Sequence, residues 1–160
     1  MSRALIAYYT KTGHTRQAGE DIAIGLTEAG IEVTVRPLAD VGAEELSAHD
    51  LIVVGSPCHA GSVKMLFSGI AGPVSKWLAS LPGDAFAGKT VAAYSVHCSF
   101  GGTTTVKNLE RLLTDLGGRA LVPGPAVKAG APLSLWRGPD ASPEDREELR
   151  QFGRDLAREV

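Results

Sequence analysis

The chain has 160 residues, of which 44% are hydrophobic and 21% charged, and its formal net charge is −2 at pH 7. This length and composition predict one globular domain over residues 1–160 with a single core, and they argue against a second domain. Because nucleic acids and anionic lipids bind to clustered Lys and Arg, the small net charge argues against both as partners.

No apolar run approaches the ~20 residues of a membrane-spanning helix, and the N-terminus lacks the basic and apolar pattern of a secretory signal. Two cysteines, Cys58 and Cys98, are too few for a disulfide scaffold, so we expect reduced thiols. The sequence therefore predicts a cytoplasmic protein without membrane insertion.

Five stretches have the length and composition of β-strands. Residues 4–9 (ALIAYY), 51–55 (LIVVG) and 90–95 (TVAAYS) are apolar enough for interior strands covered on both faces. Residues 31–36 (IEVTVR) alternate apolar with polar, and residues 119–122 (RALV) are stopped by Pro123. These two stretches therefore indicate edge strands.

Helices are expected between and after these strands. Apolar residues at helical spacing predict helices over residues 14–29 and 104–116, with shorter ones at 43–48 and 72–81. The last helix begins at Pro143, with Ser142 as N-cap and Asp145 in the capping-box position.

Strands that alternate with helices predict an α/β fold with right-handed crossovers and a parallel sheet covered on both faces. With the second and fifth strands at the edges, a doubly wound five-stranded sheet has the order 2-1-3-4-5. Ligands of such sheets bind beyond the carboxyl ends of the strands, where the direction of winding changes. The loops that start at Thr10, Ser56 and Ser95 should meet there.

The loop after the first strand has the residues of an anion site, in the order Thr10, Lys11, Thr12, Gly13, His14, Thr15. Its hydroxyls can donate, its glycine lets the backbone close tightly, and the following helix N-terminus favours negative charge. The alternative is an ordinary N-cap turn in which Thr12 caps the helix. Neither GxxxxGK[ST] nor GxGxxG is present, which disfavours a nucleoside-triphosphate loop and a dinucleotide site.

This loop resembles the phosphate loop of the flavodoxin family, whose pattern [ST]-x-T-G-x-T binds the phosphate of FMN. The resemblance continues through VVGSP (53–57) and the SxxxxxGG segment (95–102), in order and spacing over nearly the whole chain. It implies a flavodoxin-like fold, FMN as cofactor and a role in electron transport.

The resemblance also implies which residues enclose the isoalloxazine ring. They are Ser56, Pro57, Cys58, His59, Ala60 and Gly61 from the second loop, and Ser95, Val96, His97, Phe100, Gly101 and Gly102 from the third.

The large aromatic residue that the family commonly places in the second loop is missing. His59, His97 or Phe100 can stack on the ring instead, although Phe100 is also interpretable as a core residue that closes its loop. Trp136, in the long connection 124–140, is a further candidate for aromatic cover; the alternative is that it packs against the last helix or a neighbouring subunit.

Three functions remain open. An electron carrier needs no catalytic residue from the chain and exchanges electrons with redox partner proteins or a small quinone-like acceptor. The chain is also similar to flavodoxin-like NAD(P)H:quinone reductases, which makes an FMN-dependent oxidoreductase the alternative. A thiol or metal-based sensor built on Cys58, His59, His97 and Cys98 is the third hypothesis, although no CxxC or HxxxH spacing supports a metal. His49, ahead of the third strand, is expected to be solvated.

Overall fold

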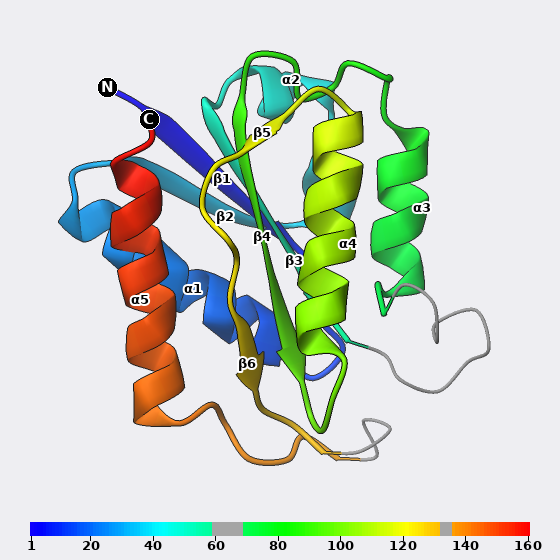
Figure 1. The fold of residues 1–160 in the computed structure, drawn as a ribbon, viewed down its shortest axis with the longest axis vertical. Coiled ribbons are helices and arrows are strands. Elements are labelled where there is room, and N and C mark those ends of the chain that lie inside the picture. Colours follow the sequence, from blue (N-terminus) through cyan, green and yellow to red (C-terminus); the bar gives the residue numbers. More distant parts are fainter. Residues whose placement is uncertain (59–68, 132–135) are drawn as a thin grey trace.

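The structure is a computed structural model that describes residues 1–58, 69–131 and 136–160 (Figure 1). Strands and helices alternate from the N-terminus as the sequence predicts. In chain order they are β1 (Arg3–Tyr8), α1 (His14–Glu28), β2 (Glu32–Pro37), the 3-10 turn η1 (Leu38–Asp40), α2 (Ala43–Ser47), β3 (Leu51–Pro57), α3 (Gly72–Ser80), β4 (Thr90–His97), α4 (Gly102–Asp115), β5 (Arg119–Ala120), β6 (Ala126–Lys128) and α5 (Pro143–Ala157).

The strands form one parallel sheet in the order β2-β1-β3-β4-β5, and β6 also pairs with β4. The predicted order 2-1-3-4-5 is therefore confirmed. The register sets Tyr8 beside Gly55 and Ser56 beside Ser95, so the last residues of β1, β3 and β4 lie at the same edge of the sheet.

The fifth strand differs from the predicted one over residues 119–122. It consists of two short pieces, β5 beside the start of β4 and β6 beside its end. Between them Pro123 has no N–H to donate, and a Cβ on Gly124 would lie 1.7 Å from the Ala93 carbonyl oxygen. Residues 126–128 of the connection 124–140 therefore form a strand.

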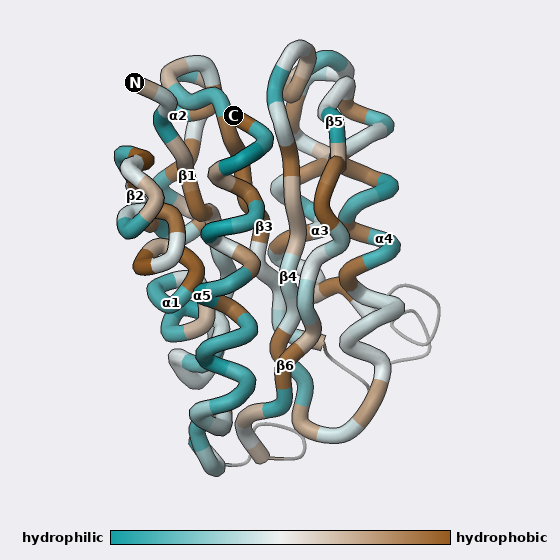
Figure 2. Tube along the Cα trace, turned by 60° about the vertical axis from the view of Figure 1, so that its left-hand side comes forward, coloured by the Kyte–Doolittle hydropathy of each residue, from teal (hydrophilic) through white to brown (hydrophobic). Residues whose placement is uncertain are grey.

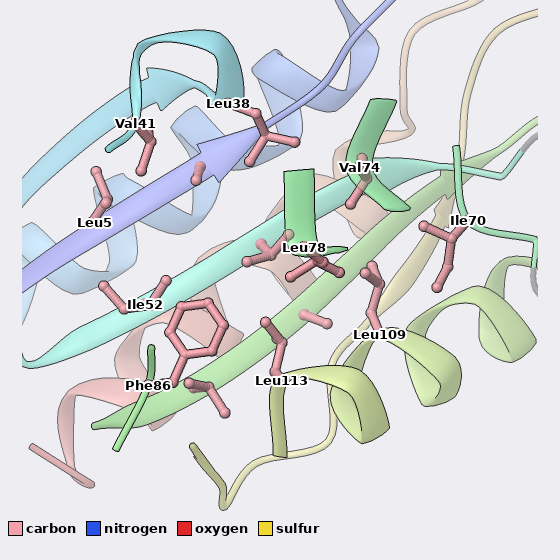
Figure 3. Packing of buried hydrophobic residues seen from close by; sticks show 14 of the residues in the cluster. Leu5, Leu38, Val41, Ile52, Ile70, Val74, Leu78, Phe86, Leu109 and Leu113 are labelled. Carbon is pink, nitrogen blue, oxygen red and sulfur yellow. The ribbon is translucent and has the colours of Figure 1, made fainter. Parts of the chain in front are cut away.

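Helices cover both faces of the sheet (Figure 1). On one face, α3 and α4 pack over side chains such as Leu5 and Ile52, and Figure 3 shows Leu78, Phe86 and Leu113 among them. On the other face, α1 and α5 cover Ile6, Val53 and Tyr94. Buried apolar area is the main stabilising term of such a layered fold.

Hydropathy follows the same layers. In Figure 2 the strands β1 and β3 are mainly hydrophobic, whereas the outer turns of α5 are hydrophilic. Each helix therefore presents one apolar stripe to the sheet. None of the helices in the described residues is long and apolar enough to cross a membrane.

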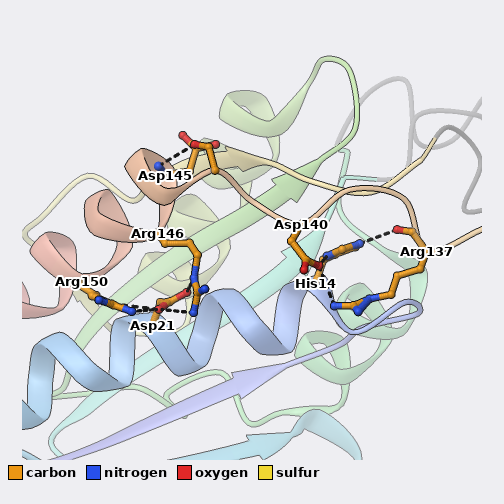
Figure 4. Close-up of polar contacts among 8 residues, drawn as sticks. His14, Asp21, Arg137, Asp140, Asp145, Arg146 and Arg150 are labelled. Carbon is orange, nitrogen blue, oxygen red and sulfur yellow. Dashed lines mark hydrogen bonds and ion pairs between the residues drawn. The ribbon is translucent and has the colours of Figure 1, made fainter.

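The contact between α1 and α5 depends on two glycines and one buried carboxylate. A Cβ on Gly25 would lie 1.9 Å from the Arg150 carbonyl oxygen, and one on Gly153 would lie 2.3 Å from the Ile22 carbonyl oxygen. These contacts let the two backbones approach closely. Asp21 on α1 is 1% exposed and pairs with Arg146 at 2.9 Å and with Arg150 at 3.1 Å (Figure 4).

Candidate functional site

The candidate site is the edge of the sheet at which β1, β3, β4 and β6 end. The loops that follow these strands lie at the lower end of the molecule in Figure 1. In a doubly wound sheet this edge holds the ligand, because winding changes direction between β1 and β3. Three of these loops carry the residues that the sequence singles out.

The first loop leads into α1 through Gly13, which is the N-cap residue with φ 95°. Only glycine adopts this left-handed conformation without strain. The Gly13 N–H donates to Thr10 Oγ1 at 2.9 Å, and the helical ladder begins with Gln17 N–H donating to Gly13 O at 3.0 Å. Thr10 therefore shapes the turn, and its hydroxyl hydrogen stays able to donate.

The start of α1 lacks the capping features that α5 has, and α3 and α4 lack them as well. No side chain caps α1 and its first turn contains no acidic residue. In α5, by contrast, Ser142 Oγ accepts from Asp145 N at 3.1 Å, and Glu144 and Asp145 lie in the first turn. The alternative that Thr12 caps α1 is therefore wrong, because Gly13 holds that position. The uncapped N–H groups at the start of α1 favour an anion.

The loop is open at Gly13. A Cβ built on Gly13 meets no atom of the described residues within 4 Å. Thr12 and Gly13 are half-buried and Lys11 is exposed. The described residues therefore leave the Cβ direction of Gly13 open, as they do at Gly30 and Gly72.

Tyr94 on β4 holds the start of α1 in place, a role that no motif in the sequence indicates. Its hydroxyl donates to the Thr15 carbonyl oxygen at 2.7 Å, and burial raises the pKa of this phenol, so it stays a donor. A Cβ on Gly55 would lie 2.2 Å from Tyr94 Cζ, and one on Gly19 would lie 2.6 Å from its hydroxyl oxygen. Both glycines make room for the ring.

The second loop begins with Ser56, whose hydroxyl is occupied by the protein itself. It accepts from Ala71 N at 3.0 Å and donates to Pro57 O at 2.9 Å. Cys58 N donates to Val96 O at 2.8 Å, and Cys58 forms an isolated bridge with Ile70. These contacts close the base of the loop. His59, Ala60 and Gly61 lie outside the described residues.

The third loop leads into α4 through Gly101, which repeats the geometry of Gly13. Gly101 is the N-cap residue with φ 90°, and α4 also has no side-chain cap and no acid in its first turn. Cys58 Sγ lies 3.5 Å from Phe100 O, so the second and third loops are in contact.

Phe100 is 68% exposed, so its interpretation as a core residue is wrong; its ring faces solvent at this edge.

The remaining residues of the third loop have different environments. Val96 points into the core under α1 and α5, so only its backbone is available to a ligand. Ser95 Oγ and His97 Nδ1 are buried and have no hydrogen-bond partner among the described residues. Gly102 must lack a Cβ, because one would lie 2.4 Å from His97 Cδ2.

His97 is neutral at neutral pH. Burial lowers its pKa below the ordinary value of 6.5, and the nearby Lys128 lowers the pKa further. A neutral imidazole offers one donor and one acceptor, and the unpartnered Nδ1 can therefore serve in either role, depending on the tautomer.

The ring of His14 does not face the region at the start of α1 where an anion is expected. Its side chain is 4% exposed, and Nε2 lies 2.6 Å from the carbonyl oxygen of Arg137, in the segment that precedes α5 (Figure 4). Trp136, next to Arg137, is 65% exposed, so it does not pack against α5 within the described chain.

Both cysteines are free thiols and are half-buried. Residues 1–58, 69–131 and 136–160 contain no group of three or more His, Cys, Asp or Glu side chains placed to hold a metal ion. Of the four residues in the sensor hypothesis, Cys58, His97 and Cys98 are described, and His59 is not.

His49 is buried, whereas the sequence analysis expects it to be solvated. It is 3% exposed, its Nδ1 lies 2.6 Å from Glu45 O, and its own carbonyl oxygen accepts from Lys89 Nζ at 2.7 Å. His49 lies at the opposite end of the sheet from the candidate site, beside an open cleft lined by Arg3 and Arg36.

Comparisons with known proteins agree with this geometry. The sequence model of the flavodoxin family matches residues 6–148. The flavodoxin of Aquifex aeolicus is 29% identical over 98% of this chain and 86% of its own, and that of Clostridium beijerinckii is 26% identical over 95% and 97%. An archaeal flavodoxin structure superimposes with a TM-score of 0.77 at 21% identity, over 98% of this chain and 97% of its own. The chain belongs to the flavodoxin family.

Proposed function

We infer that this chain is an FMN-binding electron-transfer protein of the flavodoxin type, and that residues 1–160 act as one FMN-binding domain. The observation that carries this proposal is the start of α1. It has an uncapped helix N-terminus and a left-handed glycine whose Cβ direction is open, at the edge where a doubly wound sheet binds its ligand.

The phosphate of FMN is proposed to bind at the loop of residues 10–15. Thr10, Thr12 and Thr15 supply hydroxyl groups, Gly13 supplies the tight turn, and Lys11 supplies positive charge. His14 takes part only through its backbone N–H, because its ring is bonded to Arg137 O.

The isoalloxazine ring is proposed to lie between the second and third loops. Ser56, Pro57 and Cys58, with His59, Ala60 and Gly61, form one side; Ser95, Val96, His97, Phe100, Gly101 and Gly102 form the other. The buried, unpartnered Ser95 Oγ and His97 Nδ1 fit a polar heterocycle that supplies hydrogen-bond partners. FMN, when bound, accepts and releases electrons; the chain positions the ring and limits the access of water.

Electron exchange is proposed to occur at the edge where Phe100 and Trp136 are exposed. Exposed aromatic side chains are typical of docking surfaces, and Lys11 in the first loop and Lys128 at the end of β6 are also exposed. A redox partner protein or a small quinone-like acceptor can approach there. We propose a cytoplasmic location for this exchange.

The alternative function is an FMN-dependent NAD(P)H:quinone or flavin-type oxidoreductase. The exposure of Phe100 and Trp136 favours it, because neither ring is fixed over the site by packing and a nicotinamide needs an open flavin face.

The test is to purify the protein, add FMN, remove the excess and record the absorption spectrum. Retained near-ultraviolet and blue bands are expected for both flavin functions, and a colourless protein that does not take up FMN would contradict both. NAD(P)H consumption with a quinone is then measured. Reducible flavin without turnover supports the carrier; steady turnover supports the oxidoreductase and contradicts the carrier.

A further inference from the structure

The thiol of Cys58 lies where the base of the second loop meets the third loop. Its S–H donates to the carbonyl oxygen of Phe100 at an S···O distance of 3.5 Å. A Cβ built on Gly101 would lie 3.0 Å from the same sulfur, and one built on Gly69 would lie 3.6 Å from it. The sulfur therefore occupies the space between three backbone segments.

The returning end of the second loop, at Gly69, contacts the same turn. Gly69 has φ 68°, and a Cβ on it would lie 2.2 Å from Thr105 Oγ1. Thr105 is fully buried, and its hydroxyl donates to the carbonyl oxygen of Gly101 at 3.1 Å. Both ends of the second loop, Cys58 and Gly69, are therefore packed against the turn that leads into α4.

The main chain of Cys58 is fixed, whereas the third loop has less support. Cys58 N donates to Val96 O at 2.8 Å, and Cys58 forms a bridge with Ile70. The ring of Phe100 is 68% exposed, so its packing does not anchor the third loop. We therefore expect a change in the side chain of Cys58 to act on the position of the third loop.

The other cysteine makes no comparable contact. Cys98 is also a half-buried free thiol, but its Sγ lies 3.8 Å from Ser99 Oγ, the next residue in the chain. Within residues 1–58, 69–131 and 136–160 it makes no hydrogen bond to another loop. The two thiols therefore form a matched pair, one between two loops and one within a single loop.

The size of the side chain at position 58 matters more than its hydrogen bond. A thiol is a weak donor, so the bond to the carbonyl contributes little by itself. A group added to the sulfur has no room on the side of Gly69 and Gly101. It must separate the loops or extend toward the open edge where the isoalloxazine ring is proposed to bind.

We propose that Cys58 is a positioning residue that sets the separation of the second and third loops and thereby the fit of the isoalloxazine ring between them. This proposal rests on the proposed function, because it needs a flavin between these loops. It assigns to one thiol an effect on binding of the ring and none on binding of the phosphate.

The test is reversible modification with methyl methanethiosulfonate of the Cys98→Ser protein, in which Cys58 is the only cysteine. The thiolate attacks the reagent, an S–S bond forms to the methylthio group, and methanesulfinate leaves while the thiol proton goes to the buffer. We expect the modified protein to bind FMN and riboflavin more weakly by the same factor, about 5- to 150-fold. Dithiothreitol, which removes the group, should restore both affinities.

The Cys58→Ser protein, in which Cys98 is the only cysteine, is the matched control, and the reagent should leave its flavin affinities unchanged. Without reagent, Cys58→Ala should weaken both flavins by about 2-fold, and Cys58→Ser by less, because its hydroxyl still donates. Cys58→Met has a side chain with as many heavy atoms as the methyl disulfide. It should reproduce the loss even if the thiol does not react.

The visible circular dichroism of the bound flavin separates positioning from stability. This spectrum reports the surroundings of the ring, so it should change in Cys58→Ala and not in Cys98→Ser. A role in stability alone would lower the urea midpoint of the flavin-free protein and leave the spectrum unchanged.

Unchanged flavin affinities in both the modified protein and Cys58→Met would overturn the proposal, as would an equal loss after modification of Cys98. A loss for FMN without one for riboflavin would also overturn it, because the effect would then lie at the phosphate. A wild-type protein that binds neither flavin would instead contradict the proposed function.

Discussion

The hydroxyl of Tyr94 lies 2.7 Å from the carbonyl oxygen of Thr15, and this buried hydrogen bond connects the interior strand β4 to the first turn of α1. The ring reaches this position by passing over Gly55 on β3 and beside Gly19 on α1. The geometry of the proposed phosphate loop therefore depends on side chains in the sheet below it.

Replacing Gly55 with alanine should disturb this support. The new Cβ would lie 2.2 Å from Tyr94 Cζ, so the ring must move and the bond to Thr15 must lengthen or break. Overpacking of this kind costs about 1–3 kcal/mol in the free energy of unfolding, measured by urea denaturation. Gly72→Ala is the control, because no atom lies within 4 Å of its Cβ; equal losses for both variants would contradict the role of Tyr94.

Replacing Asp21 with asparagine should loosen α5 from α1. Asp21 is 1% exposed and carries two arginine partners, and removing its charge leaves both without their carboxylate. Because the two arginines are partly exposed, we expect a loss of about 2 kcal/mol in urea denaturation, below the value for a fully buried pair. Glu28→Gln removes an exposed partner of Arg154 between the same helices and should change stability little; the reverse ranking would contradict this view.

Replacing His97 with glutamine should change the dependence of stability on pH. Burial and Lys128 lower the pKa of His97 in the folded chain, so the unfolded chain binds this proton more readily. Stability is therefore lost as pH falls from the ordinary value of 6.5 toward the lower folded value. Between pH 7.5 and 5, unfolding of the flavin-free variant should depend less on pH than that of the wild-type protein. An unchanged slope would show that the surroundings of His97 do not lower its pKa.

Replacing Phe100 or Trp136 with alanine tests contacts to the isoalloxazine ring separately from contacts to the phosphate of FMN. An aromatic partner of the isoalloxazine contributes about 0.5–1.5 kcal/mol beyond its buried area, which is about 2- to 12-fold in affinity. A variant that removes such a partner should weaken FMN and riboflavin by the same factor in fluorescence titrations. If neither variant weakens either flavin, the exposed rings do not contact the cofactor.

The sequence predicts the fold well because strong local patterns determine it. Apolar runs without interruption place β1, β3 and β4 in the interior, and Ser142 with Pro143 places the start of α5 at the residue where the structure has it. The fifth strand is less well predicted. Its second piece, β6, depends on contacts between Gly124 and β4 that no local pattern of apolar residues reveals.

The candidate site is predicted only in part. Threonine and glycine in the first loop indicate an anion before any contact is known, because their chemistry is local. Tyr94 and Arg137 contact residues that lie more than 75 positions away in the chain, and periodicity contains no information on such pairs. Gly55 makes room for the ring of Tyr94, but a glycine at the end of LIVVG does not by itself identify that ring.

The central claim is that the start of α1 holds a phosphate, and the most direct measurement compares the affinities for FMN and riboflavin in the wild-type protein and in Thr12→Glu. Two or more hydrogen bonds to a charged group predict that the wild-type protein binds FMN at least about 100-fold more tightly than riboflavin. Thr12→Glu should abolish most of this preference while retaining riboflavin, and Thr12→Gln, similar in size but uncharged, should lose less. Equal affinities in the wild-type protein, or equal losses for both flavins in Thr12→Glu, would contradict the account.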